Sequence, residues 1–126
     1  TDGSIVATGA IVERSVLSPG VYVGPQAVVR ECIILPDSSI EAGAVVERVI
    51  IDKQVTIGHN ARVGRIDPAA ADLGITTVGK RAQVPGGQTI GRNVVIGSNI
   101  LPEDFRGLIV EDGVRIEKLP FGKKTG

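Results

Sequence analysis

The sequence is poor in aromatic residues and in sulfur. Its 126 residues include no Trp and no Met, one Tyr, two Phe and one Cys. A core without large rings has to be filled by aliphatic side chains, and apolar residues still make up 42% of the chain. A lone cysteine excludes an internal disulfide, so we expect Cys32 to be a small buried residue in the reducing cytoplasm.

The sequence also lacks an excess of either charge and any long apolar run. Fourteen basic residues balance fourteen acidic ones, which leaves no net positive field to attract nucleic acid or anionic lipid. No apolar run reaches the roughly eighteen residues of a membrane span, and no signal peptide is visible. We therefore predict a cytoplasmic chain with no nucleic-acid partner and no membrane partner, and the opening Thr1 without Met indicates a piece of a longer protein.

What the sequence does contain is an internal repeat of 17 residues. Residues 11–27, 28–44 and 45–61 align row under row without a gap. Seventeen glycines and seven prolines supply turns between short strands. Four columns of the alignment hold only apolar residues, namely Val12/Val29/Val46, Val16/Ile33/Ile50, Leu17/Ile34/Ile51 and Val23/Ile40/Ile57.

The spacing of the aliphatic residues predicts the fold. They recur every five or six positions, as at Val12, Leu17 and Val23, which divides each turn into three flat sides. An aliphatic residue followed by a small one every six positions is typical of left-handed β-helices, whose corners favour Gly, Asn or Asp. The sequence therefore predicts an all-β, single-stranded left-handed parallel β-helix. The hand is taken from hexapeptide-repeat proteins, because most parallel crossovers are right-handed.

The repeat divides one β-helix domain, residues 1–126, into four parts. We predict regular coils over 1–65, an insertion over 66–77, further coils over 78–101 and a cap over 102–126.

Two segments depart from the six-residue spacing. Asp67-Pro68, three alanines and Gly74 carry the start and stop signals of a short helix, which we expect near 67–74. Asp112-Gly113 lies between alternating apolar residues and signals a hairpin. The carboxy-terminal cap is therefore expected to be a hairpin or an irregular last coil. Three apolar residues would cover its open end, namely Phe105, Leu119 and Phe121.

Two more columns alternate in charge from row to row. They are Glu13/Arg30/Glu47 and Arg14/Glu31/Arg48. Stacking the rows would bring opposite charges together. Exposed ion pairs contribute only about 0–1 kcal/mol each, so we expect these columns to specify register more than to stabilise the stack.

Two strings carry a family resemblance. Residues 12–21 read VERSVLSPGV and residues 50–53 read IIDK. Both are similar to strings in the carboxy-terminal domain of bacterial glucose-1-phosphate adenylyltransferases, also called ADP-glucose pyrophosphorylases. Thr1-Asp2-Gly3 resembles the start of that domain. The resemblance covers residues 1–65, and beyond the insertion it is carried only by the six-residue spacing and a hydrophobic tail.

The resemblance implies a longer parent enzyme that transfers an adenylyl group from ATP to glucose 1-phosphate with Mg²⁺, in glycogen or starch synthesis. It places the nucleotide-binding loop and the catalytic residues in an amino-terminal domain, and no such motif occurs here. We therefore expect this chain to have no catalytic residue, cofactor or metal site, and to be inactive alone. The implied partners are the catalytic domain, the other subunits of a tetramer, and a phosphorylated or nucleotide effector.

An interface is predicted from pairs of adjacent apolar residues. Successive strand residues face opposite ways, so one residue of each pair should point outward and form a stripe that docks the catalytic domain or another subunit. Alternatively, the strand ends bend and hide both residues. The stripe is drawn from Val16, Leu17, Ile33, Ile34, Ile50 and Ile51.

The resemblance also implies a role for Lys53. The family's matching string carries a basic residue there that contacts an anionic effector, and an ammonium group can meet a phosphate as a point charge. A corner lysine that is merely solvated is the alternative.

The fold alone does not choose a function. A hexapeptide-repeat acyltransferase would use a His as general base, and His59 is the single candidate. It occupies the position of Pro25 and Ala42 in the two preceding rows, which is typical of a plain corner. The tail of another sugar-phosphate nucleotidyltransferase and a scaffold without a small-molecule role are further alternatives, and the two strings favour the adenylyltransferase.

Overall fold

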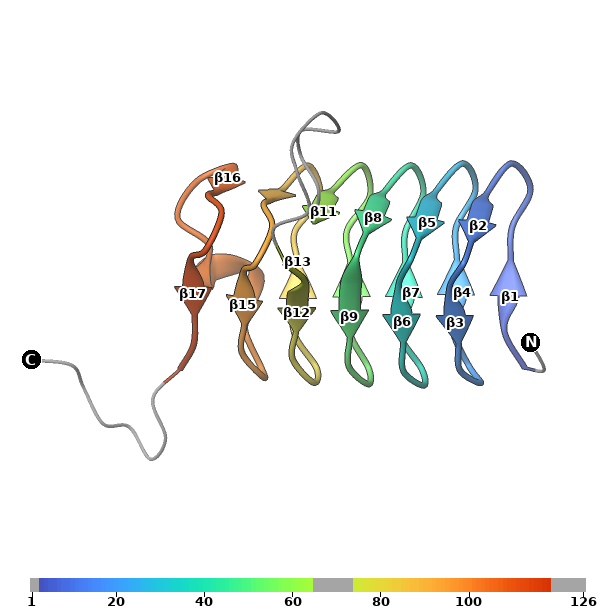
Figure 1. Cartoon of the computed structure of the whole chain (residues 1–126), viewed down its shortest axis with the longest axis horizontal. Helices are drawn as coiled ribbons and strands as arrows, with labels where there is room; N and C mark the ends of the chain where they lie inside the picture. The colour runs from blue at the N-terminus through green and yellow to red at the C-terminus, as the bar shows by residue number, and fades with distance from the viewer. Residues whose placement is uncertain (1–2, 65–73, 119–126) are drawn as a thin grey trace, which may run out of the picture.

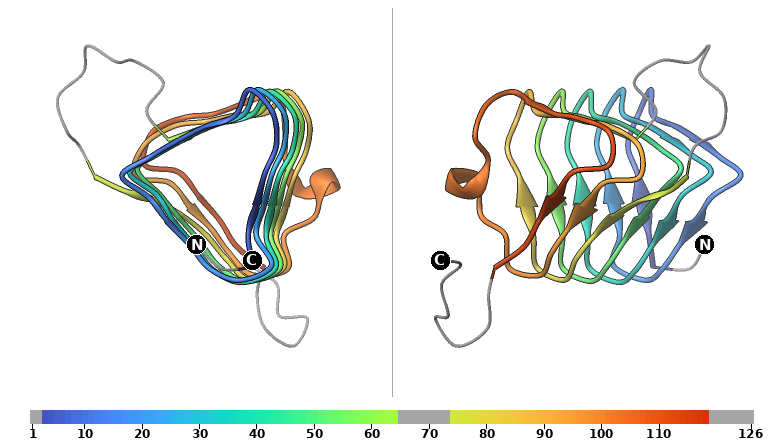
Figure 2. Two further views of the ribbon diagram at one scale, coloured as in Figure 1. Left: turned by 90° about the vertical axis from the view of Figure 1, so that its right-hand side faces the viewer. Right: turned by 60° about the vertical axis from the view of Figure 1, so that its left-hand side comes forward.

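A computed structural model describes residues 3–64 and 74–118 as a coil of short parallel strands (Figure 1). Each strand is two or three residues long, because a flat side of the coil soon reaches a corner. The strands wind around a three-sided prism (Figure 2). Seen from the amino-terminal end, in the left view of Figure 2, the chain runs counterclockwise as it recedes, so the coil is left-handed. The predicted fold is confirmed.

The three sides of the prism are three parallel sheets, here called faces A, B and C. Face A consists of β1 (Ile5–Val6), β4 (Tyr22–Val23), β7 (Ser39–Ile40), β10 (Thr56–Ile57) and β13 (Gln83–Val84). Face B consists of β2 (Ile11–Glu13), β5 (Val28–Arg30), β8 (Val45–Glu47), β11 (Arg62–Gly64), β14 (Thr89–Ile90) and β16 (Ile109–Val110). Face C consists of β3 (Val16–Leu17), β6 (Ile33–Ile34), β9 (Val49–Ile51), β12 (Thr76–Val78), β15 (Val95–Ile96) and β17 (Arg115–Ile116). A short 3-10 helix, η1 (Pro102–Asp104), interrupts the last coil.

The stacking register follows the repeat in the sequence. Val12 pairs with Val29, and the strand pairs of the first coils join residues 17 positions apart. The coil that contains the insertion is longer, since Ile50 pairs with Thr77, a step of 27 residues. The coils before and after the insertion are therefore in register with each other, and the prism continues beyond the insertion.

The core is the inside of the prism, where one aliphatic side chain per face and coil points inward. Val29, Val46 and Ile57 are completely buried. Burying a side chain of this size contributes roughly 1.5–3 kcal/mol, and the contribution recurs on each face along the stack, except at the amino-terminal end, where Val6 is 47% exposed. The described residues contain no helix long and apolar enough to cross a lipid bilayer.

The regular coils resume earlier than predicted. Strand β12 begins at Thr76, whereas the sequence indicated an insertion up to residue 77. Thr76 is buried in the column of Val49, and its hydroxyl donates a hydrogen bond to the carbonyl of Gly91 at 2.6 Å. Threonine is a polar residue at an inward position and does not fit the aliphatic pattern, so the sequence did not predict this strand. The helix expected near 67–74 lies outside the described residues.

The hairpin considered for the carboxy terminus is not formed. Strands β16 and β17 belong to different faces and pair in parallel with β14 and β15, so the last coil is irregular but still part of the prism. Asp112-Gly113 makes the corner between them, because the Asp112 carboxylate accepts hydrogen bonds from Arg92 of the preceding coil at 2.8 Å. Of the three residues expected to cover the end, Phe105 is half-buried against the core. The other two, Leu119 and Phe121, lie outside the described residues.

We predict that Val46→Asp lowers the free energy of unfolding by about 3–5 kcal/mol, because it leaves an unpaired charge inside the prism. Val45→Asp is the matched control, since Val45 is the outward neighbour on the same strand and should cost less than about 1 kcal/mol. Urea denaturation followed by circular dichroism measures both changes. Equal losses in the two variants would contradict the inward packing.

Candidate functional site

The predicted interface stripe lies on the outside of face C. Val16 is 56% exposed, Ile33 is 44% exposed, and Ile50 is half-buried on the same outer column. Their partners in each pair are buried in the core, namely Leu17, Ile34 and Ile51. Because strand residues alternate in direction, the six candidates reduce to an outer stripe of three, called the face C stripe below.

A second aliphatic column lies on the outside of face B. Ile11 is 42% exposed and pairs in register with Val28, which pairs with Val45. The sequence carries a signal for this column too, an outward aliphatic residue directly before an inward valine. On the fourth coil the outward residue of face B is Arg62. The column of face B therefore stays aliphatic over the first three coils, and exposed aliphatic residues return at the carboxy-terminal end with Leu108 and Ile109.

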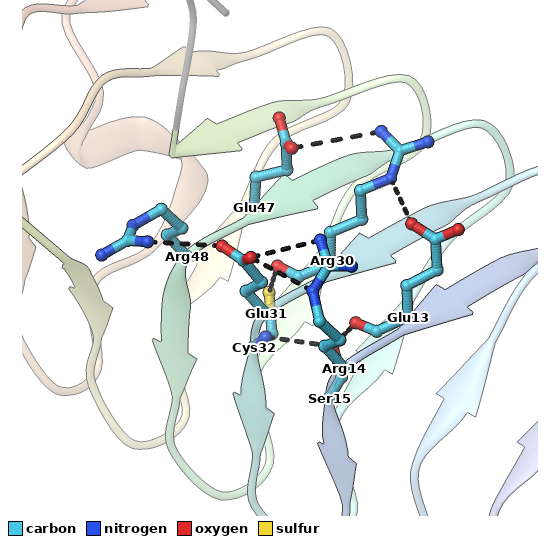
Figure 3. Close-up of polar contacts among 8 residues, drawn as sticks. All are labelled: Glu13, Arg14, Ser15, Arg30, Glu31, Cys32, Glu47 and Arg48. Carbon is cyan, nitrogen blue, oxygen red and sulfur yellow. Dashed lines mark hydrogen bonds and ion pairs between the residues drawn. The ribbon is translucent and has the colours of Figure 1, made fainter. Parts of the chain in front are cut away.

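The first charged column forms the ion pairs expected from the sequence (Figure 3). The Arg30 guanidinium lies 2.9 Å from the Glu13 carboxylate on the coil below and 4.0 Å from the Glu47 carboxylate on the coil above. One cation thus bridges two acids at the corner between faces B and C.

The second charged column has the opposite signs. Glu31 accepts from Arg14 at 3.2 Å and from Arg48 at 3.3 Å. All three residues occupy the left-handed backbone region, with φ values of 47°, 54° and 56° for Arg14, Glu31 and Arg48. That conformation costs a residue with a Cβ roughly 1–2 kcal/mol, so the corner geometry, rather than the ion pairs, fixes the backbone here.

Cys32 lies buried beside this double column. Its backbone N–H donates to the Ser15 hydroxyl at 3.0 Å, and its thiol contacts the Arg30 carbonyl at 3.1 Å. Burial raises the pKa of the Cys32 thiol to about 11. The thiol therefore stays protonated at neutral pH and acts as a small core residue.

Lys53 is exposed at the corner between faces C and A. Its backbone N–H donates to the Asp52 carboxylate at 2.7 Å, which closes the corner after β9. Its side chain makes no ion pair with any residue between positions 3 and 64 or between 74 and 118. This placement fits a contact with a dissolved anion.

Two further cations share this corner, and sequence analysis missed them. The register that pairs Ile51 with Val78 continues around the corner to Ile57 and Val84, so Lys80 takes the position of Lys53 one coil later. The backbone N–H of the next residue, Arg81, donates to the Lys53 carbonyl at 2.9 Å. The insertion separates these residues in the sequence and hides their proximity.

His59 lies at an exposed corner between faces A and B. Its carbonyl accepts from Gly87, just as the carbonyl of Ala42 accepts from Asn60 one coil earlier, so its position repeats that of an ordinary corner residue. Its ring packs over Gly86. No described side chain is hydrogen-bonded to this ring, so nothing there orients it as a general base.

The carboxy-terminal end of the prism is hollowed. The hollow measures about 530 Å³, and its inner wall includes Ile100, Val110 and Ile116. Asp104 lies on its rim and pairs with Lys118 at 3.3 Å. The backbone N–H of Leu101 and this ammonium hold the pKa of Asp104 below its usual value. Across the part of the chain that the structure describes, no three His, Cys, Asp or Glu side chains gather as metal ligands.

The sequence is similar to one protein family and to several curated enzymes. The profile of the GlmU-like C-terminal hexapeptide family matches residues 1–81. Glucose-1-phosphate adenylyltransferase of Acetivibrio thermocellus is 39% identical over 126 residues, which cover 91% of this chain and 30% of that protein. The enzyme of Thermomicrobium roseum is 47% identical over 98 residues, covering 71% of this chain and 23% of that protein. The chain thus spans less than a third of the length of these curated relatives.

Solved structures with the same fold include acetyltransferases. The acetyltransferase domain of PglB from Neisseria gonorrhoeae superposes with a TM-score of 0.76 at 18% identity, covering 94% of this chain and 53% of that one. A mutant GDP-perosamine N-acetyltransferase from Caulobacter crescentus superposes with a TM-score of 0.59 at 19% identity, covering 94% of this chain and 52% of that one. At such identities the likeness shows the fold alone.

We predict that Arg30→Glu lowers the free energy of unfolding by about 1–2 kcal/mol at low salt, because it places three carboxylates in one column. Adding Glu13→Gln and Glu47→Gln to this variant removes the repulsion and should restore about half of the loss. Urea titrations at low salt and at about 0.5 M NaCl check both effects, since salt screens exposed charges. An Arg30→Glu chain as stable as the original at low salt would contradict the expectation that these stacked charges specify the register.

We predict that Cys32 resists 5,5′-dithiobis(2-nitrobenzoate) in the folded chain at pH 8. With a pKa of about 11, roughly one thiol in a thousand is ionised at that pH, and the thiol is buried. A chain with Cys32→Ser and Ser98→Cys is the control, because Ser98 is an exposed corner residue whose thiol should react at once. Rapid labelling of native Cys32 would show that this wall of the prism opens.

Proposed function

The chain belongs to the GlmU-like C-terminal hexapeptide family, and we propose that it is the carboxy-terminal domain of a glucose-1-phosphate adenylyltransferase. In that role it holds subunits together and supplies part of an effector site. The observation that carries the proposal is the 39% identity with the Acetivibrio thermocellus enzyme across 91% of the chain. The solved acetyltransferases share its fold at under 20% identity and provide no comparable support.

The proposed parent enzyme converts ATP and glucose 1-phosphate to ADP-glucose and pyrophosphate. Mg²⁺ would be held with ATP by the catalytic domain and not by this chain, whose described carboxylates are dispersed or paired with arginines at the corners. The β-helix contributes a rigid rod of stacked coils. Such a rod can fix the distance between subunits without taking part in the chemistry.

The outer aliphatic columns support the assembly role. A soluble monomer rarely exposes contiguous apolar surface, yet Val16 and Ile33 are exposed one above the other on face C. Ile11 adds a second exposed aliphatic column on face B of the same coils. Burying these columns against another subunit, or against the catalytic domain, would remove this surface from water.

Lys53 supports the regulatory role. Its ammonium is exposed at a corner and has no carboxylate partner among the described residues. A phosphorylated metabolite or a nucleotide could therefore pair with it without breaking an existing contact. The catalytic domain would complete the site, which couples effector binding to the reaction.

We predict that the full-length parent protein forms ADP-glucose and that Lys53→Ala raises its half-saturating effector concentration about three- to tenfold, the loss expected for one charge-assisted contact. Arg62→Gln is the control, because it removes an exposed cation from another face of the next coil. The assay follows pyrophosphate release from ATP and glucose 1-phosphate across an effector titration. A parent with no nucleotidyl transfer would overturn the proposed enzyme class, and an unchanged titration would remove Lys53 from the site.

We predict that Ile33→Gln in the full-length parent weakens the tetramer at least tenfold, since it places a polar amide in the face C stripe. The fold should persist because the Ile33 side chain points outward. Ser39→Gln on face A of the same coil is the control. Analytical ultracentrifugation across a range of protein concentrations measures the association constant. An unchanged association constant would show that the face C stripe does not join subunits, and docking of the catalytic domain would remain as its role.

A further inference from the structure

One corner of the last coil is formed by a chemically reactive pair of residues. Asp112 and Gly113 lie between β16 and β17, and both are exposed to water. An aspartate followed by glycine is prone to rearrange spontaneously, because glycine has no side chain to hinder an approach to its backbone nitrogen. The position itself favours glycine, since Gly113 has a left-handed φ of 81°. A fragile sequence is therefore kept at this corner by the backbone geometry.

The rearrangement would convert Asp112 to isoaspartate through a cyclic imide. The Gly113 nitrogen forms a bond to Cγ of the Asp112 carboxyl group, and the hydroxyl of that group leaves as water with the proton of the nitrogen. Water then opens the ring. Attack at Cγ restores aspartate, whereas attack at the former backbone carbonyl gives isoaspartate, whose backbone runs through the side chain and is longer by a methylene group. No reagent other than water takes part.

Both groups that would react are bound by the preceding coil. The backbone N–H of Gly113 donates to the carbonyl of Arg92 at 2.9 Å. The backbone N–H of Arg92 donates to Oδ1 of Asp112 at 2.8 Å, and its Nη2 donates to Oδ2 at 2.8 Å. Arg92 thus holds the attacking nitrogen and the attacked carboxyl group, and ring closure has to turn the carboxyl group away from these donors.

Charge adds a second restraint on the reaction. The Arg92 guanidinium, together with the Arg92 backbone N–H, holds the pKa of Asp112 below its ordinary value. The carboxyl group is therefore ionised at neutral pH, and an ionised carboxylate has no hydroxyl group to lose. The Arg92 side chain is only 13% exposed, while that of Asp112 is 49% exposed. The restraint thus acts on a carboxylate that water still reaches.

Gly91 makes room for this arrangement. A Cβ atom on Gly91 would collide with the Asp112 carboxylate and would lie 2.9 Å from the Asp112 backbone nitrogen. Gly91 is buried, and its N–H donates to the Val110 carbonyl at 2.9 Å, which fixes the approach of the last coil. Gly91 and Arg92 therefore form the surface against which Asp112-Gly113 packs.

We propose that Asp112-Gly113 is a latent isoaspartate site, which Arg92 keeps unreacted by binding both groups that would have to combine. Conversion lengthens the corner between β16 and β17 and shifts the carboxylate that Arg92 binds to a different carbon atom. Strand β17 supplies Ile116 to the wall of the carboxy-terminal hollow, so the modification would loosen the end of the prism. The inference concerns the lifetime of the last coil and does not depend on the proposed function.

Ageing of the folded 126-residue chain tests the site. The chain is kept at about 37 °C and about pH 6, where an ordinary aspartic acid still has a small neutral fraction. Isoaspartate at position 112 is measured by peptide mapping with mass spectrometry, and a synthetic peptide of residues 107–115 gives the unrestrained rate. We expect the folded chain to react at least about tenfold more slowly than this peptide, because the reaction has to wait for local opening.

Substitutions identify the cause of the protection. Arg92→Gln should raise the rate about fivefold, since it removes the ion pair but keeps the backbone contacts. Gly91→Ala should also raise the rate, since the added methyl group displaces the Asp112 carboxylate. Arg115→Gln is the matched control, because Arg115 is an exposed cation of the same coil that pairs with Glu117 at 3.1 Å. Its rate should equal that of the original chain.

The inference is wrong if the folded chain reacts as fast as the peptide, or if Arg92→Gln reacts no faster than Arg115→Gln. Ile116→Ala is a second control, because it weakens the packing of β17 on the core but removes none of the contacts between Arg92 and Asp112. An equal acceleration by Ile116→Ala would show that rigidity alone protects the site, which would reject the role of Arg92. Circular dichroism melting establishes that each variant is folded at the ageing temperature.

Discussion

Aliphatic packing inside a three-sided prism is the constraint on which the rest of this structure depends. Each coil contributes inward side chains of similar size, and residues such as Val46 and Ile57 are completely sealed from water. The interior has a constant, narrow width, so it accepts Val, Ile, Leu and Ala. Trp and Met are absent from the sequence, and a large ring would have to push neighbouring coils apart.

This constraint leaves the outer surface free to carry chemistry. An outward side chain contacts other surface side chains, mostly those in its own column, so charges and apolar groups can be changed without disturbing the core. The Arg30 bridge, the face C stripe and the cations around Lys53 are three uses of that freedom on three parts of one rod. The same fold supports acetyltransferases with little sequence in common, because the core pattern does not dictate what the outside does.

Much of the fold and part of the candidate site could be predicted from the sequence. The 17-residue rows placed Val29 under Val46 and Arg30 between Glu13 and Glu47, as the structure has them. Short-range signals were less informative, and of the hairpin and the irregular last coil that the sequence left open at the carboxy terminus, the irregular coil is the one formed. Asp112-Gly113 favours a hairpin locally, but parallel pairing of β16 and β17 with the previous coil is satisfied only if the pair makes a corner. The strand that begins at Thr76 was not predicted, because threonine breaks the aliphatic pattern. Its hydroxyl is nevertheless buried and hydrogen-bonded inside the prism.

By itself, the sequence determined the period of the coil, the columns that face inward and the alternation of charge at one corner. These features are local, because side-chain direction alternates along a strand and repeats with the row. The tertiary structure decided which residue of each apolar pair faces water and which residues meet across the insertion. Lys80 lies above Lys53 because the longer coil returns to the same register, and the hydrogen bonds between coils that restore this register join residues far apart in the chain.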